Sequence, residues 1–326
     1  ELDLKRKTQR NMGKPPVYDR SALNLTDAER TALRASREGY WRFLLDQERI
    51  EWNDGILGPQ SIDAASLSDP VLIRADGQVL YTHASVVDDI DMGITHVVRG
   101  MDHVTNTAVQ AQIMRALGAQ PPEFAHHSML TGPDGEGLSK RLGALSLRDL
   151  RAAGVEPMAI LSLMARLGSS NPVQAEIDIA ALRDGFEPTH FSAAPTRFDP
   201  ADLTPLSAKV LHRLSVDDVA EDLDKAGVPK ELQASFWAAV GPNLTQRAEI
   251  VKWWTICRDG AASKAEGDEA ALWPQAMNIL PDFPYDEHSW SAWTGRVAAA
   301  TGRKGKALFH PLRRLATGED KGPDMK

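Results

Sequence analysis

The N-terminal part of this 326-residue chain alternates hydrophobic and polar positions with a period of two. This alternation predicts short strands over residues 41–45, 49–52 and 71–74. The turn residues at 75–77 predict that the third of these strands forms a hairpin with residues 78–82.

Two local signals frame these strands. Thr26 and Glu29 have the spacing of a capping box, which predicts a helix over residues 27–37. Asp54 and Gly55 predict a turn after the second strand. Gly and Pro residues interrupt the charged start of the chain, so residues 1–20 indicate the end of a helix and a linker.

From residue 95 the pattern predicts a strand followed by a helix. Residues 95–99 form a short apolar run that ends on Arg99 and Gly100. Asp102 or Thr105 can cap a helix that ends at Gly118. The residues at helical spacing predict its buried face: Val104, Ala108, Ala111, Met114 and Leu117.

Arg99 is a candidate for ligand binding because of its place at the end of this strand. In open α/β sheets, ligands lie beyond the carboxyl ends of the strands, next to the N-termini of helices. The guanidinium fork of Arg99 can bind a carboxylate in two places, and it can equally pair with a structural acid.

The second half of the chain has a helical period. Helices are predicted over the following residues: 145–154, 156–168, 215–226, 231–240, 246–259 and 291–301. Four prolines between 188 and 205 indicate a junction ahead of the last four. Six tryptophans are predicted to be core residues: Trp237, Trp253, Trp254, Trp273, Trp290 and Trp293.

Composition narrows the protein classes. The length predicts two or three domains, and 42% hydrophobic with 25% charged residues is typical of a soluble globular protein. The single cysteine, Cys257, excludes a disulfide framework within the chain and suits the reducing cytoplasm. The sequence contains no apolar run of membrane-spanning length, so no membrane partner is expected.

Charge gives a more local signal. The net charge of −8 argues against a non-specific polyanion binder, but the distribution of cations decides whether nucleic acid binds. Residues 301–314 contain five Lys and Arg residues and no acid. The segment is interpreted either as a solvated helix end or as an edge that contacts phosphates.

Residues 127–143 contain the strongest candidate for phosphate chemistry. Three glycines, at 132, 135 and 137, exclude a regular element, and Ser139, Lys140 and Arg141 follow. Two adjacent cations on a loop can clamp a polyphosphate, although a solvated basic turn has the same composition.

Two other clusters favour structural readings. Asp88, Asp89 and Asp91 are interpreted as capping or turn residues rather than a metal site, because no His or Glu falls at ligand spacing. His126 and His127 are interpreted as strand-end or core histidines rather than zinc ligands.

Several motifs occur in one order that carries a family likeness. Tyr81 precedes VVDD (86–89), which is followed by DMGITHVVRG (91–100), MDHVTNT (101–107) and GLSKR (137–141). Together they resemble the second half of a bacterial glutamyl-tRNA synthetase. The run KGKALFHPLRRLATG (304–318) resembles the anticodon-binding end of that family. The likeness extends over most of the chain.

The resemblance implies a class I synthetase of multidomain α/β plus α architecture. The regions expected from it are an acceptor-end-binding insertion over residues 1–76, the second half of a Rossmann-like catalytic domain over 77–130, a stem-contact region over 131–206, and a helical anticodon-binding domain over 207–326. The chain is expected to be a monomer in the cytoplasm.

The implied reaction has two steps. The α-carboxylate of glutamate attacks the α-phosphorus of ATP, which gives glutamyl-adenylate and pyrophosphate, and the terminal ribose of tRNA(Glu) then accepts the glutamyl group. Glutaminyl specificity and the charging of tRNA(Gln) remain open. Mg²⁺ is expected to accompany ATP, held mainly by phosphate oxygens.

The resemblance also assigns residues to the substrates. On ATP, Lys140 would neutralise phosphate charge, with Ser139 and Arg141 beside it as catalytic residues. The remaining ATP contacts would come from the same loop and from the strand before it: Gly137, Leu138, Met129 and Leu130. For glutamate, the implied pocket residues are Tyr81, Ser85 and Arg99, with Asp102 and His103 nearby.

The sequence departs from the family pattern in four respects. The His-Ile-Gly-His signature is absent, so the chain is expected to be inactive as written and to be a fragment of the enzyme. Second, Gly137 occurs where many members have Lys. Third, two positions differ: Met101 occurs where an acid is usual, and Ser85 occurs where some members have Asn. No cysteine set is present for the zinc site of some members, so no zinc is expected.

Two alternative functions are considered beside the ligase. A catalytically silent paralogue that binds tRNA or a partner protein would explain the missing signature. A relative that glutamylates a modified anticodon base would share the catalytic motifs, but it lacks the helical C-terminal region that this sequence contains.

Overall fold

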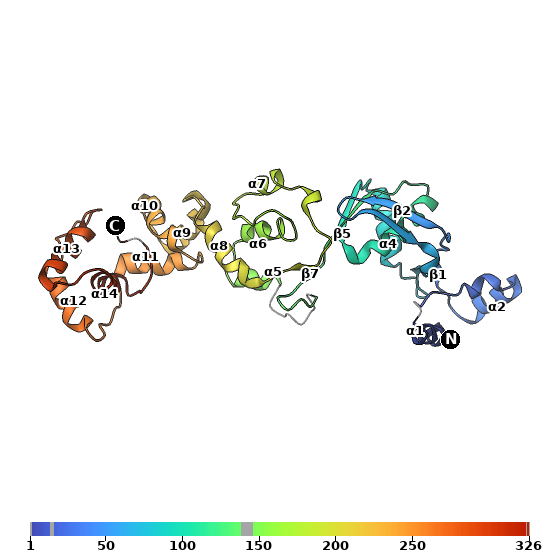
Figure 1. Ribbon diagram of the computed structural model, residues 1–326, viewed down its shortest axis with the longest axis horizontal. Helices are drawn as coiled ribbons and strands as arrows, with labels where there is room; N and C mark the ends of the chain where they lie inside the picture. The colour runs from blue at the N-terminus through green and yellow to red at the C-terminus, as the bar shows by residue number, and fades with distance from the viewer. Residues whose placement is uncertain (1, 14–15, 138–145, 324, 326) are drawn as a thin grey trace. The chain divides into compact units, whose positions relative to one another are not determined.

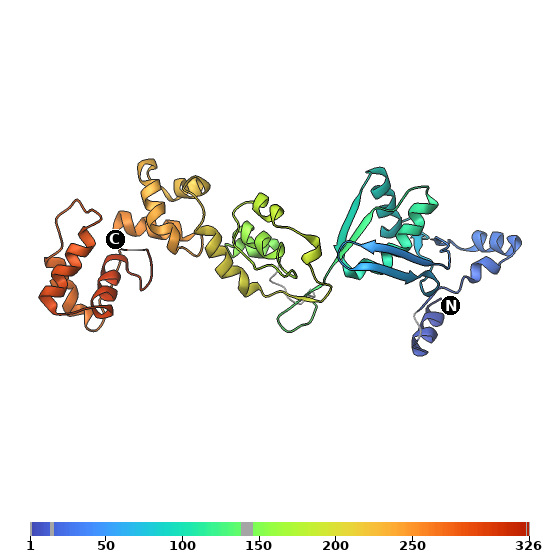
Figure 2. The same ribbon diagram turned by 45° about the horizontal axis from the view of Figure 1, so that its top comes forward.

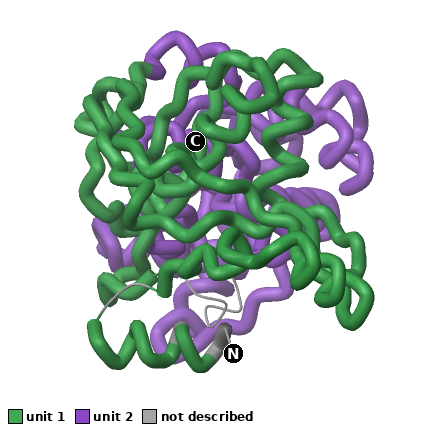
Figure 3. The backbone as a smooth tube through the Cα atoms, turned by 90° about the vertical axis from the view of Figure 1, so that its right-hand side faces the viewer, with its two compact units in different colours: residues 1–138, 168–171, 187–198 green, residues 139–167, 172–186, 199–326 purple. Residues whose placement is uncertain are grey.

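The computed structural model describes residues 2–13, 16–137, 146–323 and 325. The chain falls into two compact units, which Figure 3 colours separately. Unit 1 comprises residues 1–138, 168–171 and 187–198, and unit 2 comprises residues 139–167, 172–186 and 199–326. Leu138, Ser139, Lys140 and Arg141 lie outside the described residues.

Unit 1 mixes helices with short strands (Figure 1). Its elements in chain order are α1 (Leu2–Asn11), η1 (Ser21–Asn24), α2 (Asp27–Ser36), β1 (Trp41–Arg42), β2 (Arg49–Asp54), β3 (Gly58–Asp63), η2 (Ala64–Ser66), β4 (Val71–Ile73), α3 (Tyr81–Asp91), β5 (His96–Gly100), η3 (Met101–His103), α4 (Val104–Ala116), β6 (Glu123–His127), β7 (Leu130–Thr131), η4 (Pro188–His190) and β8 (Thr196–Arg197).

The strands of unit 1 pair two by two. β2 and β3 form an antiparallel hairpin in which Arg49 pairs with Asp63 and Asp54 pairs with Gly58. β5 and β6 are parallel, in register from His96 opposite Glu123 to Gly100 opposite His127, and α4 connects them. β1 pairs with β4 in antiparallel fashion, and β7 pairs with β8 in parallel fashion.

Helix α4 is the centre of unit 1. Every residue from Thr107 to Met114 is buried, so the helix has neighbours on all sides rather than one apolar face. Ala108 and Ala111 pack with Ile50 of the β2–β3 hairpin, which Figures 1 and 2 show beside α4. Val109, Ile113 and Met114 pack instead with Val86 of α3 and with Leu45.

Several predictions for unit 1 are confirmed. The capping box of Thr26 and Glu29 is formed at the start of α2, and each side chain bonds the backbone N–H of the other. The predicted strand over 95–99 is β5, displaced by one residue. Helix α4 stops just before Gly118, which adopts φ +81° and so favours glycine.

Other predictions for unit 1 are wrong. The predicted hairpin forms only in part: Val79 bridges to Ile73, and the N–H groups of Arg74 and Leu80 bond the carbonyls of Gln78 and Leu72. Residues 78–82 are nevertheless not a strand, because α3 begins at Tyr81. Leu117 is 53% exposed, since it follows the last buried turn of α4. Neither Asp102 nor Thr105 caps α4. The 3₁₀ turn η3 leads directly into the helix, and Val104 N–H bonds the carbonyl of Met101.

The predicted strand over 41–45 is shorter than expected. Only Trp41 and Arg42 pair with β4. Further along, the N–H of Leu45 bonds the Asp69 carboxylate, which replaces a strand partner. The ion pair between Asp69 and Arg20 holds that carboxylate in place.

All regular elements in the described part of unit 2 are helices (Figure 1). Its elements are α5 (Leu147–Ala152), α6 (Pro157–Met164), α7 (Ile179–Asp184), η5 (Pro200–Asp202), α8 (Leu203–Leu211), η6 (Asp217–Val219), α9 (Ala220–Ala226), α10 (Lys230–Val240), η7 (Gly241–Asn243), α11 (Glu249–Asp259), α12 (Glu269–Asn278), α13 (Ser289–Thr301) and α14 (Lys306–Thr317). The sequence pattern predicted six helical segments in this part of the chain and missed α7, α8, α12 and α14.

The tryptophans of unit 2 are core residues, as predicted. Trp237, Trp253 and Trp254 belong to a cluster formed by α9, α10 and α11. Trp273 and Trp293 belong to a second cluster formed by α12, α13 and α14, and Trp290 packs against it. Among the described residues, every helix is too short or too polar to cross a membrane.

Candidate active site

Three of the residues predicted to hold glutamate, Arg99, Asp102 and His103, lie at or just after the carboxyl end of β5. Tyr81 and Ser85 lie one turn apart at the start of α3, which packs against α4. The rings of Tyr81 and His103 meet edge to face with their centroids 5.9 Å apart. Ser85 Oγ accepts a hydrogen bond of 2.9 Å from Gln110 Nε2 on α4.

Arg99 is held on two sides by neutral groups. Its Nη2 donates to Thr107 Oγ1 at 2.6 Å, and its Nε donates to His126 Nε2 at 3.3 Å. The guanidinium carbon also lies 5.6 Å from the centre of the Phe124 ring, a cation–π contact. Neither of these two hydrogen-bond partners, Thr107 and His126, carries a negative charge.

The positive charge of Arg99 interacts electrostatically with the carboxyl group of Asp89 on α3. Burial raises the pKa of the Asp89 carboxyl, the positive charge of Arg99 partly offsets that effect, and the negative charge of Asp88 adds to it. Asp88, Asp89 and Asp91 all lie within the last turns of α3, so they are helical residues rather than the capping or turn residues that the sequence predicted. Among the described residues, the structure contains no group of three or more His, Cys, Asp or Glu side chains that could hold a metal ion.

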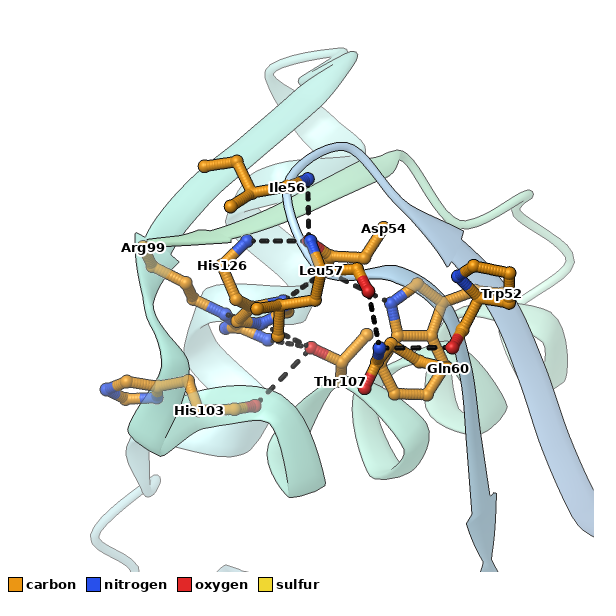
Figure 4. A network of polar contacts seen from close by, with 10 residues as sticks. Trp52, Asp54, Ile56, Leu57, Gln60, Arg99, His103, Thr107 and His126 are labelled. Atoms are coloured by element: carbon orange, nitrogen blue, oxygen red, sulfur yellow. Dashed lines mark hydrogen bonds and ion pairs between the residues drawn. The ribbon is translucent and has the colours of Figure 1, made fainter. Parts of the chain in front are cut away.

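Behind Arg99 lies a buried polar network that the sequence pattern did not reveal (Figure 4). His126 is fully buried on β6, and its Nδ1 lies 2.5 Å from Asp54 Oδ2. Asp54, at the end of β2, has a side chain that is also fully buried. Thr107 Oγ1 lies 3.0 Å from His126 Nε2, so α4 closes the network.

The Asp54 carboxylate accepts hydrogen bonds from several protein N–H groups. Its Oδ1 accepts the backbone N–H groups of Ile56, Leu57 and His126 at 2.9–3.1 Å, and its Oδ2 accepts Trp52 Nε1 at 3.3 Å. Burial alone would raise the pKa of Asp54. The hydrogen bonds from the His126 side chain and from these backbone groups outweigh it and hold the pKa below its ordinary value. Asp54 is therefore an anion in the interior.

The turn after β5 brings Asp102 and Met129 next to Gly100. A Cβ at Gly100 would lie 2.5 Å from Asp102 Oδ1 and 3.3 Å from Met129 Sδ. Asp102 also lies 3.8 Å from His103 Nε2, and Asn106 Nδ2 contacts His103 Nδ1 at 3.0 Å. The absence of a Cβ at Gly100 therefore lets the Asp102 and Met129 side chains approach this backbone closely.

Met129 and Leu130 are at the start of the short parallel pair β7–β8. The Met129 carbonyl accepts the N–H of Thr196 at 3.0 Å, which occupies one of its two lone pairs. Leu130 opens β7 opposite Thr196. Met129 itself is 43% exposed, so its side chain can contact a ligand.

The glycine-rich turn is described as far as Gly137. Gly132 N–H bonds the Glu136 carbonyl at 2.7 Å, and Gly135 adopts φ +83°. No regular element forms between Gly132 and Gly137, as predicted.

The basic segment near the C-terminus is partly neutralised within unit 2. Arg314 contacts Glu269 at 3.2 Å and Asp320 at 3.6 Å, and Arg313 donates to the Pro323 carbonyl. Lys304 and Lys306 are exposed at the start of α14. The segment thus combines structural cations with cations that face solvent.

Comparison with known proteins gives a consistent result. Residues 1–205 match the family described as tRNA synthetases class I (E and Q), catalytic domain. The whole chain is 63% identical to 74% of glutamate–tRNA ligase 2 of Ruegeria sp.. It is also 62% identical to 74% of glutamate–tRNA ligase 1 of Ruegeria pomeroyi.

Solved structures share the fold. The glutamate–tRNA synthetase of Elizabethkingia anophelis superimposes with a TM-score of 0.77 at 23% identity, over 99% of this chain and 73% of that one. The glutamate tRNA ligase of Elizabethkingia meningosepticum, solved in complex with its amino acid, gives a TM-score of 0.78 at 24% identity over the same shares.

Proposed function

Because this chain belongs to the glutamate–tRNA ligase family of class I aminoacyl-tRNA synthetases, we propose that it activates glutamate with ATP and transfers the glutamyl group to the 3′ end of tRNA(Glu). The support is identity of 60–63% with glutamate–tRNA ligases over essentially the whole chain. A silent paralogue or a base-modifying relative has no comparable support.

The proposed domain arrangement is that of the family. Residues 77–130 would be the second half of the Rossmann-like catalytic domain, and the parallel unit β5–α4–β6 supports this. Residues 1–76 would bind the acceptor end of tRNA, residues 131–206 the stem, and residues 207–326 the anticodon. The partners would be glutamate, ATP, tRNA(Glu) and, as an open possibility, tRNA(Gln), and the enzyme would be a cytoplasmic monomer.

The observation that carries the glutamate assignment is the environment of Arg99. Its Nε and Nη2 are held by neutral partners at the carboxyl end of β5, so the positive charge is fixed in place and available to an acidic ligand. The reacting α-carboxylate must stay free to attack phosphorus, so Arg99 would bind the side-chain carboxylate. Tyr81, Ser85, Asp102 and His103 would line the rest of the pocket.

ATP would lie on the other side of Gly100. The Met129 and Leu130 backbone would receive adenine, and Gly137 to Arg141 would cover the phosphates. Lys140 and its neighbours Ser139 and Arg141 would stabilise negative charge that moves onto pyrophosphate. Mg²⁺ would be bound mainly through phosphate oxygens of ATP.

Substitution of Arg99 by lysine tests this function in the full gene product. An ammonium cannot keep the bonds to Thr107 and His126 and also hold a carboxylate, so the KM for glutamate should rise roughly 30-fold with the KM for ATP unchanged. The assay is pyrophosphate exchange in the presence of tRNA. The matched control is Arg20→Lys, which alters a second Arg of unit 1 that is paired with Asp69. An unchanged glutamate KM in Arg99→Lys would refute the assignment.

A further inference from the structure

We infer that Asp54 and His126 are positioning residues that fix the orientation of the Arg99 guanidinium. The inference rests on the proposed role of Arg99 in glutamate binding. It gives both residues a part in substrate recognition. By sequence alone, Asp54 of the β2–β3 hairpin is a turn residue and His126 is a core or strand-end residue.

The first step concerns the proton on His126. The guanidinium of Arg99 has donors and no acceptor, so His126 Nε2 must accept the bond from Arg99 Nε. The ring proton is therefore assigned to Nδ1, where it is donated to Asp54 Oδ2. The anionic Asp54 is what favours this tautomer.

The second step concerns rigidity. Three backbone N–H groups hold Asp54 Oδ1, and one of them belongs to His126 itself. The aspartate therefore binds both the backbone and the ring of His126. Phe124, two residues earlier on β6, stacks near the His126 ring with a centroid separation of 6.3 Å and an angle of 15°. Rotation of the ring would break several of these contacts at once.

The third step links this rigidity to the pocket. His126 Nε2 and Thr107 Oγ1 accept hydrogen bonds from Nε and Nη2 of Arg99, which leaves the Nη1 group for the proposed ligand. A donor on His126 Nε2, produced by a tautomer change or by protonation, would face the N–H of Arg99 and repel it. Loss of the Asp54 charge should therefore alter the position of the Arg99 guanidinium. The effect passes through the His126 ring, because Asp54 itself does not contact the substrate.

Nitrogen-15 NMR of histidine-labelled full gene product tests the tautomer directly. We expect His126 to be neutral with its proton on Nδ1 at neutral pH, assigned by the signal that disappears in His126→Asn. Asp54→Asn should move the proton to Nε2. Detection of an Nε2-protonated or doubly protonated His126 ring in the unsubstituted protein would overturn the inference without any need for a variant to fold.

Kinetics test the consequence for glutamate with a pair of variants at one position. Asn at 126 can still donate to Asp54 but cannot reach Arg99, whereas Gln can place an acceptor where Nε2 lies. We expect His126→Asn to raise the glutamate KM roughly tenfold with the ATP KM unchanged, and His126→Gln to recover part of that loss. Equal effects of the two substitutions on the glutamate KM would refute a positioning role.

Asp69→Asn is the matched control for Asp54→Asn. Asp69 is a buried aspartate of the same unit whose carboxylate also accepts hydrogen bonds from an arginine and a backbone N–H, but these come from Arg20 and Leu45 rather than from His126. Both substitutions should lower the thermal midpoint, and only Asp54→Asn should raise the glutamate KM. A raised glutamate KM in both variants would mean that Asp54 has a purely structural role. If Arg99→Lys leaves the glutamate KM unchanged while the NMR result holds, the proposed pocket fails and the network remains.

Discussion

Substitution of Arg247 by methionine should destabilise unit 2 because it leaves a buried carboxylate without its partner. Arg247 Nε and Nη2 bind both oxygens of Glu156, at 2.7 and 3.0 Å. Its Nη1 binds Asp222 Oδ2 at 2.8 Å and the Asp218 carbonyl at 3.1 Å. The hydrogen bond to Glu156, opposed by burial and helped by Asp222, raises the pKa of Arg247, so its charge is permanent.

The exposed fractions set the magnitude. The Glu156 side chain is 7% exposed, whereas those of Arg247 and Asp222 are 32% and 33% exposed. Removal of one partner from a fully buried pair costs about 3–5 kcal/mol, and the partial exposure of Arg247 reduces this to about 2–3 kcal/mol. Asp222→Asn, at the exposed end, should cost less than about 1 kcal/mol.

Urea unfolding followed by tryptophan fluorescence measures these differences, since Trp237, Trp253 and Trp254 belong to the adjoining core cluster. A double-mutant cycle with Glu156→Gln should give a coupling free energy of about 2 kcal/mol. Equal destabilisation by Arg247→Met and Asp222→Asn would refute the argument, because burial of Glu156 would then not matter.

Two further predictions concern Lys140, in the proposed ATP-binding loop, and the buried Asp54. Lys140→Ala in the full gene product should reduce transition-state stabilisation for adenylate formation by ~2–4 kcal/mol, and unchanged pyrophosphate exchange would exclude the proposed role of the loop. Because the pKa of Asp54 is lowered in the folded state, its charge stabilises the fold above the unfolded pKa, and this contribution is lost as pH falls through the folded pKa. The unfolding free energy of the unsubstituted protein should therefore decline more steeply below about pH 4 than that of Asp54→Asn, and parallel acid limbs in the two urea-unfolding series would contradict this.

Local signals in the sequence were sufficient for much of the fold. The capping box at Thr26 and the left-handed Gly118 act within one or two turns, so their neighbours along the chain determine the outcome. The tryptophan-rich helices were predicted to be core for a similar reason, because large aromatic side chains at helical spacing need a common buried face.

Features that depend on tertiary contacts could not be predicted in this way. Residues 78–82 fit a strand by pattern alone, but Val86, further along the same segment, packs with Leu45 and with α4, and this favours a helix from Tyr81. Leu117 fits the spacing of the buried face of α4, yet the neighbours of that helix end one turn earlier. The pairing of Asp54 with His126 has no signature, because neither residue lies in a motif that names its partner.

The distance along the chain between Asp54 and His126 has a consequence for folding order. The two residues are 72 positions apart, so their contact forms only after a long loop closes. The parallel unit β5–α4–β6 can place Arg99, Thr107 and His126 together by itself, but without the docked β2–β3 hairpin the His126 ring lacks the anion that fixes its proton. A folding intermediate that has formed only this unit therefore contains Thr107 and His126 beside Arg99 and still has no fixed acceptor for the Arg99 guanidinium. If Arg99 binds glutamate as proposed, the glutamate pocket is completed only when the β2–β3 hairpin docks.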